Sequence, residues 1–219
     1  MRYDILAVYI FCLSGVGNFV IAQDDVWARW DPGVIEKANT AKDFEYYSDE
    51  EKKVVFFMNL ARLDGPLFAE TILDAYVENK QVENNAYLRS LYRDLKKTKG
   101  LGLLYPEEDL TSIAQGHANY SERTGHVGHK NFNKRFEPLM GNPYSNVGEN
   151  CSYGYPNAVD IVVTLLIDDG VKNLGHRKNT LKPGFNSVGV AIRGHKQFRY
   201  NCVIDFGIKD RSSLNNAPI

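Results

Sequence analysis

The chain has 219 residues, of which 43% are hydrophobic and 24% are charged, a balance typical of a soluble globular protein with one domain or two small ones. This composition excludes intrinsic disorder, collagen and coiled coil as overall classes. Because 26 Lys and Arg residues face 27 Asp and Glu residues, the formal charge is only −1. No net basic field therefore favours binding to nucleic acid, and partners have to be inferred from a site.

The first element in the chain is an apolar stretch over residues 5–22 that follows Arg2 and ends with Val20 and Ala22. Small residues at these two positions are typical of the −3 and −1 sites of a signal-peptide cleavage site. The pattern predicts a secretory signal over residues 1–22, and hence a secreted protein, located in the periplasm or cell exterior if the host is Gram-negative. A retained membrane anchor is the alternative, but two glycines and an asparagine interrupt the run. No transmembrane segment is expected after cleavage.

Cleavage of the predicted signal would change the number of cysteines in the mature chain. Cys12 leaves with it, so the mature chain keeps Cys151 and Cys202 in a compartment that permits disulfides. We therefore predict a Cys151–Cys202 disulfide bond. The alternative is a Cys151 nucleophile with His176 as its base, which requires a free thiol.

The N-terminal half is predicted to be mostly helical. Residues 23–47 contain Trp27 and Trp30 without a sustained period, and we interpret them as a leader that packs through its aromatic side chains. Ser48 and Glu51 have the spacing of a capping box, which predicts a helix that extends to Leu63. Two further helices are expected over residues 67–78 and 85–97.

A fourth helix is expected after Pro106 and should end at Gly125. Its apolar face follows helical periodicity closely and is made of Leu110, Ile113, Ala114, His117, Ala118 and Ser121. Because His117 lies on this face, we expect a buried, hydrogen-bonded structural histidine and not a ligand. Residues 124–155 are rich in Gly, Asn, His and Pro and predict a long loop region, with one short extended piece near residues 147–153.

The C-terminal half is predicted to supply the sheet. Residues 158–167 are rich in β-branched side chains, which suits a buried strand, but the length of this run favours a helix. Residues 185–193 and 198–206 read as an antiparallel hairpin, with His195 in the turn. Helices followed by an antiparallel sheet indicate an α+β domain.

Three stretches concentrate polar side chains beside glycines. They are TGHVGH at residues 124–129, GENCSYG at 148–154 and LIDDGVKNLGHRKN at 166–179. Together they offer imidazoles and carboxylates from separate loops. The metalloprotease pattern H-E-x-x-H, the G-x-S-x-G elbow, the Walker loop and the Rossmann glycine pattern are all absent from the sequence, so the common hydrolase and nucleotide-binding classes lose their usual support.

The order of GEN, GHR, P-x-F-x-x-V-G-V-A and C-V-I-D-F-G, preceded by the N-x-x-R of Asn59 and Arg62, resembles the CAP superfamily. This superfamily includes cysteine-rich secretory proteins, antigen 5 and class 1 pathogenesis-related proteins, and the chain is most similar to its cysteine-poor bacterial branch. The resemblance implies a three-layer α-β-α sandwich around a small antiparallel sheet, which agrees with the α+β prediction. We divide the mature chain into a leader at 23–47, a CAP (SCP) domain at 48–208 and a C-terminal tail at 209–219.

The resemblance also implies a cleft in which two histidines and two acidic residues face one another. Glu149 matches the acid of GEN, His176 the histidine of GHR, and His129 the upstream histidine, with His126 at a variable position. The second acid is Asp168 or Asp169, where many relatives have a glutamate, and the choice between them stays open. His129 and His176 would be the ligands of a divalent cation, Zn²⁺ or another, and the carboxylates could orient the imidazoles.

The motifs and the family resemblance leave two functions open. The first is a secreted binding module without turnover, whose extracellular partner is a lipid, a peptide or a cell-envelope component and not a nucleic acid. The resemblance and the absence of an activated-nucleophile motif favour it. The alternative is a metal-assisted hydrolase, peptidase or esterase-like, in which the ion activates water and Glu149 is the general base. If the protein is catalytic, we expect Glu149 and His176 to be the catalytic residues.

Overall fold

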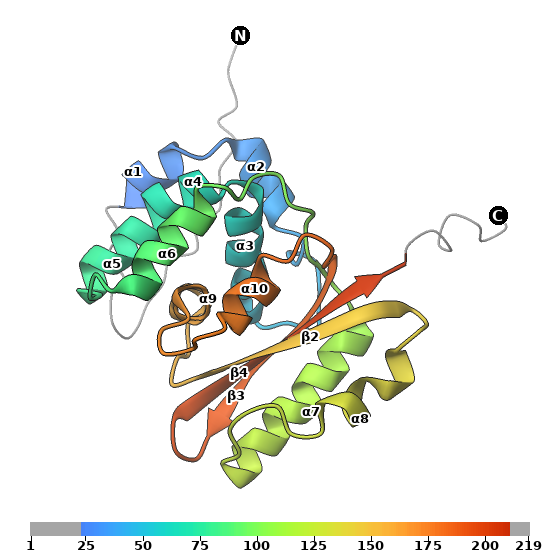
Figure 1. Cartoon of the computed structure of the whole chain (residues 1–219). Helices are drawn as coiled ribbons and strands as arrows, with labels where there is room; N and C mark the ends of the chain where they lie inside the picture. The colour runs from blue at the N-terminus through green and yellow to red at the C-terminus, as the bar shows by residue number, and fades with distance from the viewer. Residues whose placement is uncertain (1–22, 211–219) are drawn as a thin grey trace, which may run out of the picture.

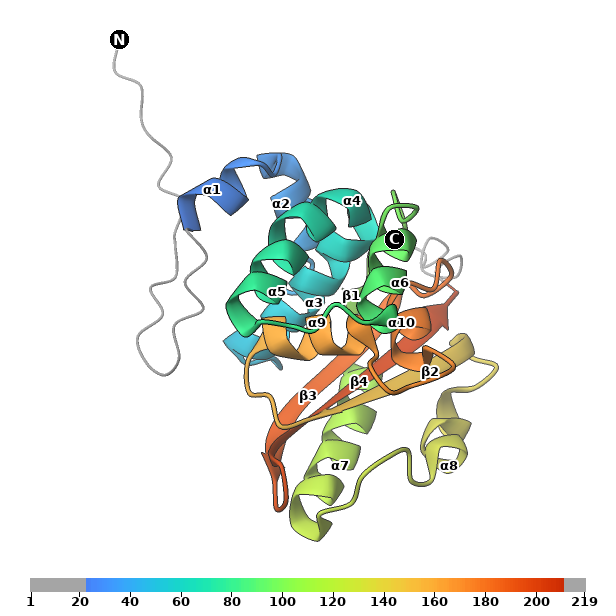
Figure 2. The same ribbon diagram turned by 60° about the vertical axis from the view of Figure 1, so that its left-hand side comes forward.

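The computed structural model describes residues 23–210, so the signal prediction for residues 1–22 lies outside the described residues. A four-stranded sheet in the order β1-β3-β4-β2 forms the middle layer, with helices on both faces (Figures 1 and 2). The strands are β1 (Tyr105–Pro106), β2 (Tyr144–Tyr153), β3 (Ser187–His195) and β4 (Arg199–Lys209). β2, β3 and β4 pair antiparallel, and the short β1 pairs parallel with β3. The α-β-α sandwich expected from the sequence is therefore confirmed.

One face of the sheet is covered by α7 (Glu108–Thr124) together with the short α8 (Phe132–Phe136) and a 3-10 turn, η2 (Glu137–Leu139). The other face carries the larger helical layer. Its members are α1 (Gln23–Ala28), α2 (Pro32–Ala38), α3 (Asp49–Leu63), α4 (Gly65–Phe68), η1 (Ala69–Leu73), α5 (Asp74–Lys80), α6 (Ala86–Leu95), α9 (Ala158–Ile167) and α10 (Gly175–Thr180). None of the helices within residues 23–210 has the length and apolar character needed to cross a membrane.

Side-chain caps explain where α3, α6 and α9 begin. Ser48 accepts a hydrogen bond from the amide of Glu51, and the Glu51 carboxylate accepts one from the amide of Ser48, so the capping box expected from the sequence starts α3. The side chains of Asn85 and Asn157 accept hydrogen bonds from backbone amides in the first turns of α6 and α9. The helix expected over 67–78 is continuous from α4 to α5 and contains a π turn at η1.

The segment before α3 belongs to the same core as the rest of the chain. Residues 23–47 form α1 and α2 despite their lack of a sustained period. Trp30 is 3% exposed, and its indole N–H donates to Thr71 Oγ1 at 3.2 Å. Ala38, Ala41 and Tyr47 are also buried in this core. The aromatic packing expected of this segment is therefore present.

α7 approaches the sheet very closely where it crosses β3. At Gly189 in β3, a side-chain carbon would overlap the backbone of Leu110 and Thr111 in α7. Glycine is thus required at this point because any side chain would push the helix off the sheet. The close contact fixes the inward face of α7, including His117, against the strands.

The predicted disulfide between Cys151 and Cys202 is wrong. Cys151 in β2 pairs with Val203 in β4, and Cys202 pairs with Ser152. Because successive side chains in a strand point to opposite faces, the two thiols lie on opposite sides of the sheet. Cys151 packs with Ala114 of α7, whereas Cys202 belongs to the core under α3 and α9. Both cysteines are buried and free.

Candidate functional site

Glu149 is the buried centre of a polar cluster on the α7 side of the sheet. Its side chain is 1% exposed, and its Oε1 lies 2.8 Å from Nδ1 of His129. Arg135 donates from Nη2 to Oε1 at 2.9 Å, and its Nη1 is 2.7 Å from Oε2. Both carboxylate oxygens of Glu149 are therefore engaged by cationic or hydrogen-bonding partners.

These partners keep Glu149 ionised. Burial by itself would raise the pKa of Glu149, but the hydrogen bonds from His129 and Arg135 and the positive charge of Arg135 outweigh it and lower the pKa to about 2. A carboxylate with so low a proton affinity is a weak general base near neutral pH. The geometry suits Glu149 to orienting His129.

His129 is the exposed member of the dyad with Glu149. It lies between α7 and α8, and its side chain is 48% exposed although its partner carboxylate is buried. Since Nδ1 faces Glu149, the neutral ring donates Nδ1–H and keeps its lone pair on Nε2. An exposed imidazole with a fixed tautomer results.

A second dyad of the same kind joins His176 and Asp168. Asp168 ends α9 with a left-handed backbone (φ 58°), and its side chain is 1% exposed. Its Oδ1 is 2.7 Å from Nδ1 of His176, while Oδ2 accepts from the amides of His176 at 2.9 Å and Arg177 at 3.2 Å. Asp169 is exposed and accepts a hydrogen bond from Asn85 at 3.0 Å. Asp168 is thus the acid that contacts the histidine.

The two dyads adjoin β2, the edge strand of the sheet, and come from segments on its two faces, α7 to α8 and α9 to α10 (Figure 2). Glu149 points toward α7, whereas the side chain of the next residue, Asn150, donates to the carbonyl oxygen of His176 at 3.0 Å. Within residues 23–210, no hydrogen bond or ion pair joins one dyad to the other. Each dyad offers a partly exposed imidazole backed by a buried carboxylate, which is the arrangement that orients histidines in metal sites.

The fold and these motifs agree with a comparison of the sequence with protein families. The family described as CAP, the cysteine-rich secretory protein family, matches residues 57–206. The chain belongs to the CAP family. A comparison of the sequence with curated proteins gave no match.

Solved structures of other CAP proteins are similar to this chain at low identity. An outer surface protein from Borrelia burgdorferi is 15% identical, with a TM-score of 0.43, over 59% of this chain and 97% of that one. Venom allergen-like protein 4 from Schistosoma mansoni is 14% identical, with a TM-score of 0.47, over 75% and 91%. An extracellular protein containing a SCP domain from Bacillus anthracis is 18% identical, with a TM-score of 0.41, over 62% and 50%.

His117 of this CAP domain is buried, as the sequence predicts, but it also borders the site. Its exposed fraction is 2%, and its Nε2 lies 2.8 Å from the carbonyl oxygen of Gly128 and 4.0 Å from Oε1 of Glu149. Burial lowers the pKa of His117, and the negative charge of Glu149 offsets only part of that effect. The neutral ring therefore donates to Gly128. The helical periodicity of the sequence places His117 on the inward face of α7. It carries no information about which residue of the sheet faces His117, and so could not identify Glu149.

Two residues of the Glu149 cluster were missed by the sequence analysis. Arg135 lies in α8, within the region read as a loop, and no motif marks it. Asp205 lies within the C-V-I-D-F-G stretch and pairs with Glu149 across β2 and β4. Burial, followed by the nearby negative charge of Glu149, raises the pKa of Asp205 well above its usual range. Asp205 is therefore a neutral acid beside an ionised one.

The thiol of Cys151 does not have the properties of a nucleophile. Burial, with the charge of Glu149 adding to it, raises the pKa of Cys151 well above its usual value, and reactive thiols need a lowered one. Its Sγ lies 3.7 Å from Nδ1 of His129. His176, the base that this hypothesis requires, makes no hydrogen bond or ion pair with Cys151 in the described part of the chain.

His195 fulfils the turn role expected of it. It is the last residue of β3, and its Nδ1 accepts from the amides of Gln197 and Phe198 at 3.2 Å. Its Nε2 is 3.1 Å from the carbonyl oxygen of His126. The ring therefore holds the β3-β4 turn and the loop after α7 together.

Proposed function

We propose that this CAP domain acts outside the cell as a binding module for a lipid, a peptide or a cell-envelope component, at the surface that carries His129 and His176. One observation supports it most directly: both imidazoles are partly exposed and are held at Nδ1 by buried carboxylates at 2.8 and 2.7 Å. Fixed polar groups at a surface give orientation and specificity to a bound ligand. The proposed extracellular location rests on the signal pattern of residues 1–22.

The hydrolase alternative is less well supported by the site. It needs Glu149 to accept a proton from water, but this side chain is 1% exposed and its pKa is lowered to about 2. A general base works best when its pKa lies near the operating pH. Orientation of His129 is the role that the contacts of Glu149 favour.

A divalent ion held by His129 and His176 stays a prediction. Each ring has the tautomer that leaves Nε2 free for a metal, but the two dyads come from segments on the two faces of the sheet (Figure 2). The binding proposal does not depend on such an ion. It depends only on two oriented, accessible imidazoles.

The experiment is a capture of envelope components by immobilised protein. Wild-type protein and the His129→Ala/His176→Ala double variant are exposed to an envelope extract of the producing organism, and the retained lipids and peptides are identified by mass spectrometry. Asp169→Asn is the matched control because Asp169 contacts Asn85 and neither histidine. We expect components that bind the wild type and the control but not the double variant. No enrichment on the wild type, or equal enrichment on the double variant, would overturn the proposal.

A further inference from the structure

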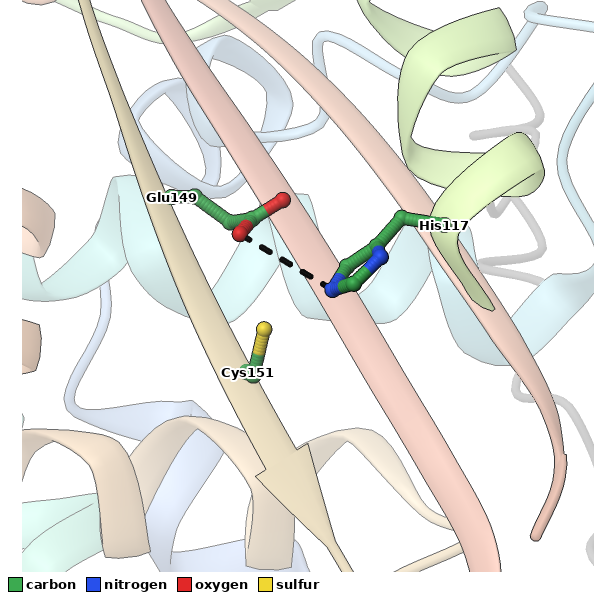
Figure 3. A group of neighbouring side chains, drawn as sticks. All are labelled: His117, Glu149 and Cys151. Carbon is green, nitrogen blue, oxygen red and sulfur yellow. Dashed lines mark ion pairs between the residues drawn. The ribbon is translucent and has the colours of Figure 1, made fainter. Parts of the chain in front are cut away.

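Three buried side chains converge behind the exposed face of His129. His117 comes from α7, and Glu149 and Cys151 come from β2; their exposed fractions are 2%, 5% and 7%. One imidazole nitrogen, one carboxylate oxygen and the sulfur all lie within 4.8 Å of one another. Figure 3 shows the side chains directed into the same space between the strand and the helix.

His129 adds a fourth donor atom to this group. Its Nδ1 lies 2.8 Å from Oε1 of Glu149 and 3.7 Å from Sγ of Cys151, and Nε2 of His117 is 4.0 Å from the same Oε1. With Zn–N bonds near 2.0 Å and Zn–S bonds near 2.3 Å, a tetrahedral zinc ion separates its ligand atoms by about 3.3 to 3.6 Å. The observed separations bracket this range, so small side-chain movements would complete a tetrahedron.

The surrounding charges also suit a buried cation. A thiol that coordinates zinc loses its proton, so Cys151 and Glu149 would balance the two charges of the ion. Arg135 adds one positive charge beside Glu149. Asp205 is completely buried, and neither of its carboxyl oxygens has a hydrogen-bond partner. Such a group is costly to bury without a charge or donor nearby, and a cation beside Glu149 would offset part of that cost.

We propose that His117, Glu149, Cys151 and Nδ1 of His129 together hold one zinc-class divalent ion in a closed, buried site. On binding, the Cys151 proton leaves to solvent. The proton of His117 moves to Nδ1, with loss of the hydrogen bond to Gly128, and that of His129 moves to Nε2. Because a neutral imidazole offers one lone pair, this site and the pair His129 and His176 exclude each other.

A surface pocket borders the proposed site at His117. The pocket has a volume of about 170 Å³. Its lining residues are Gly116, His117, Tyr120, Lys130, Asn131 and Arg135.

Cobalt(II) titration of tag-free protein tests the proposal, because cobalt reports its ligands by absorption. A thiolate ligand gives a charge-transfer band in the near ultraviolet, and a tetrahedral ion gives intense visible bands. Cys151→Ser and His117→Gln remove two of the four ligands. Cys202→Ser and His176→Ala are the matched controls: a buried cysteine on the other face of the sheet, and a histidine outside the site. Circular dichroism and cooperative urea unfolding verify the fold of each variant.

We expect the wild type and both controls to bind one cobalt ion with a thiolate band. Cys151→Ser should lose that band, and both ligand variants should lose affinity by about 100-fold or more, since even residues that only support a ligand are worth 10 to 100-fold. Absence of a thiolate band in the wild type would overturn the proposal. Loss of binding in His176→Ala, with retention in Cys151→Ser and His117→Gln, would also overturn it and would place the ion at His129 and His176.

Discussion

Replacement of Glu149 by glutamine is the sharpest single perturbation of the site. The amide keeps the shape of the carboxylate but removes its charge, and the side chain is 1% exposed. His129 and Arg135 then lose the anion that orients them. We expect Glu149→Gln to lower the free energy of unfolding and also to release His129.

The size of the effect follows from the pKa of Glu149. The native pKa of about 2 is lower than the ordinary value of 4.5, so the ionised carboxylate stabilises the native state above pH 4.5 and loses this contribution as the pH falls toward 2. The shift corresponds to about 3 kcal/mol at pH 7. At pH 3, between the two pKa values, about 1 kcal/mol of this stabilisation remains.

Urea unfolding of wild type and Glu149→Gln at pH 7 and pH 3 measures both values. Glu70→Gln is the control, because Glu70 pairs with Arg29 at an exposed site where both side chains are about half accessible; such pairs contribute less than about 1 kcal/mol. A difference for Glu149→Gln that is below about 1 kcal/mol at pH 7, or one that does not shrink at pH 3, would refute the account of Glu149.

Three further predictions test other parts of the structure. Asp168→Asn should lower the free energy of unfolding by about 1 to 2 kcal/mol, because it weakens the hydrogen bonds to the His176 ring and to the backbone amides of His176 and Arg177. Asp169→Asn should have little effect in the same urea experiment. Gly189→Ala should lower the free energy of unfolding by about 3 kcal/mol or more, because the added methyl group overlaps α7. In Gly116→Ala the added methyl group meets open space, and this variant should stabilise α7 by up to about 1 kcal/mol. Thermal unfolding compares the two variants. Alkylation without reductant should label Cys151 and Cys202 only after denaturation, and peptide mapping that finds them linked would contradict the register of β2 and β4.

The parts of the fold that local sequence determines were predictable. The capping box of Ser48 and Glu51 marks the start of α3 because the two residues bond each other's amides. The ambiguity of residues 158–167 has a physical reason: most of α9 is buried, so it lacks the polar face that identifies an amphipathic helix. The length of this run favoured a helix over a strand, and the structure confirms the helix.

Features that depend on strand register and on contacts between distant elements were not predictable. Two cysteines separated by about fifty residues look like a bridge until the pairing of Ser152 with Cys202 shows that the thiols point to opposite faces. His117, Arg135 and Asp205 approach Glu149 from three elements. The residues named from family motifs did form carboxylate–histidine dyads, because those motifs carry the tertiary information that composition and periodicity lack.

Buried carboxylates hold His129 and His176 at Nδ1, which leaves Nε2 of each partly exposed ring for a ligand. Long-range ¹⁵N–¹H correlation spectra of the metal-free protein at neutral pH report which ring nitrogen carries the proton. We expect a proton on Nδ1 of both histidines, and loss of that preference at His129 in Glu149→Gln and at His176 in Asp168→Asn. A proton on Nε2 of either histidine in the wild type, or rings averaging freely between the two tautomers, would contradict it.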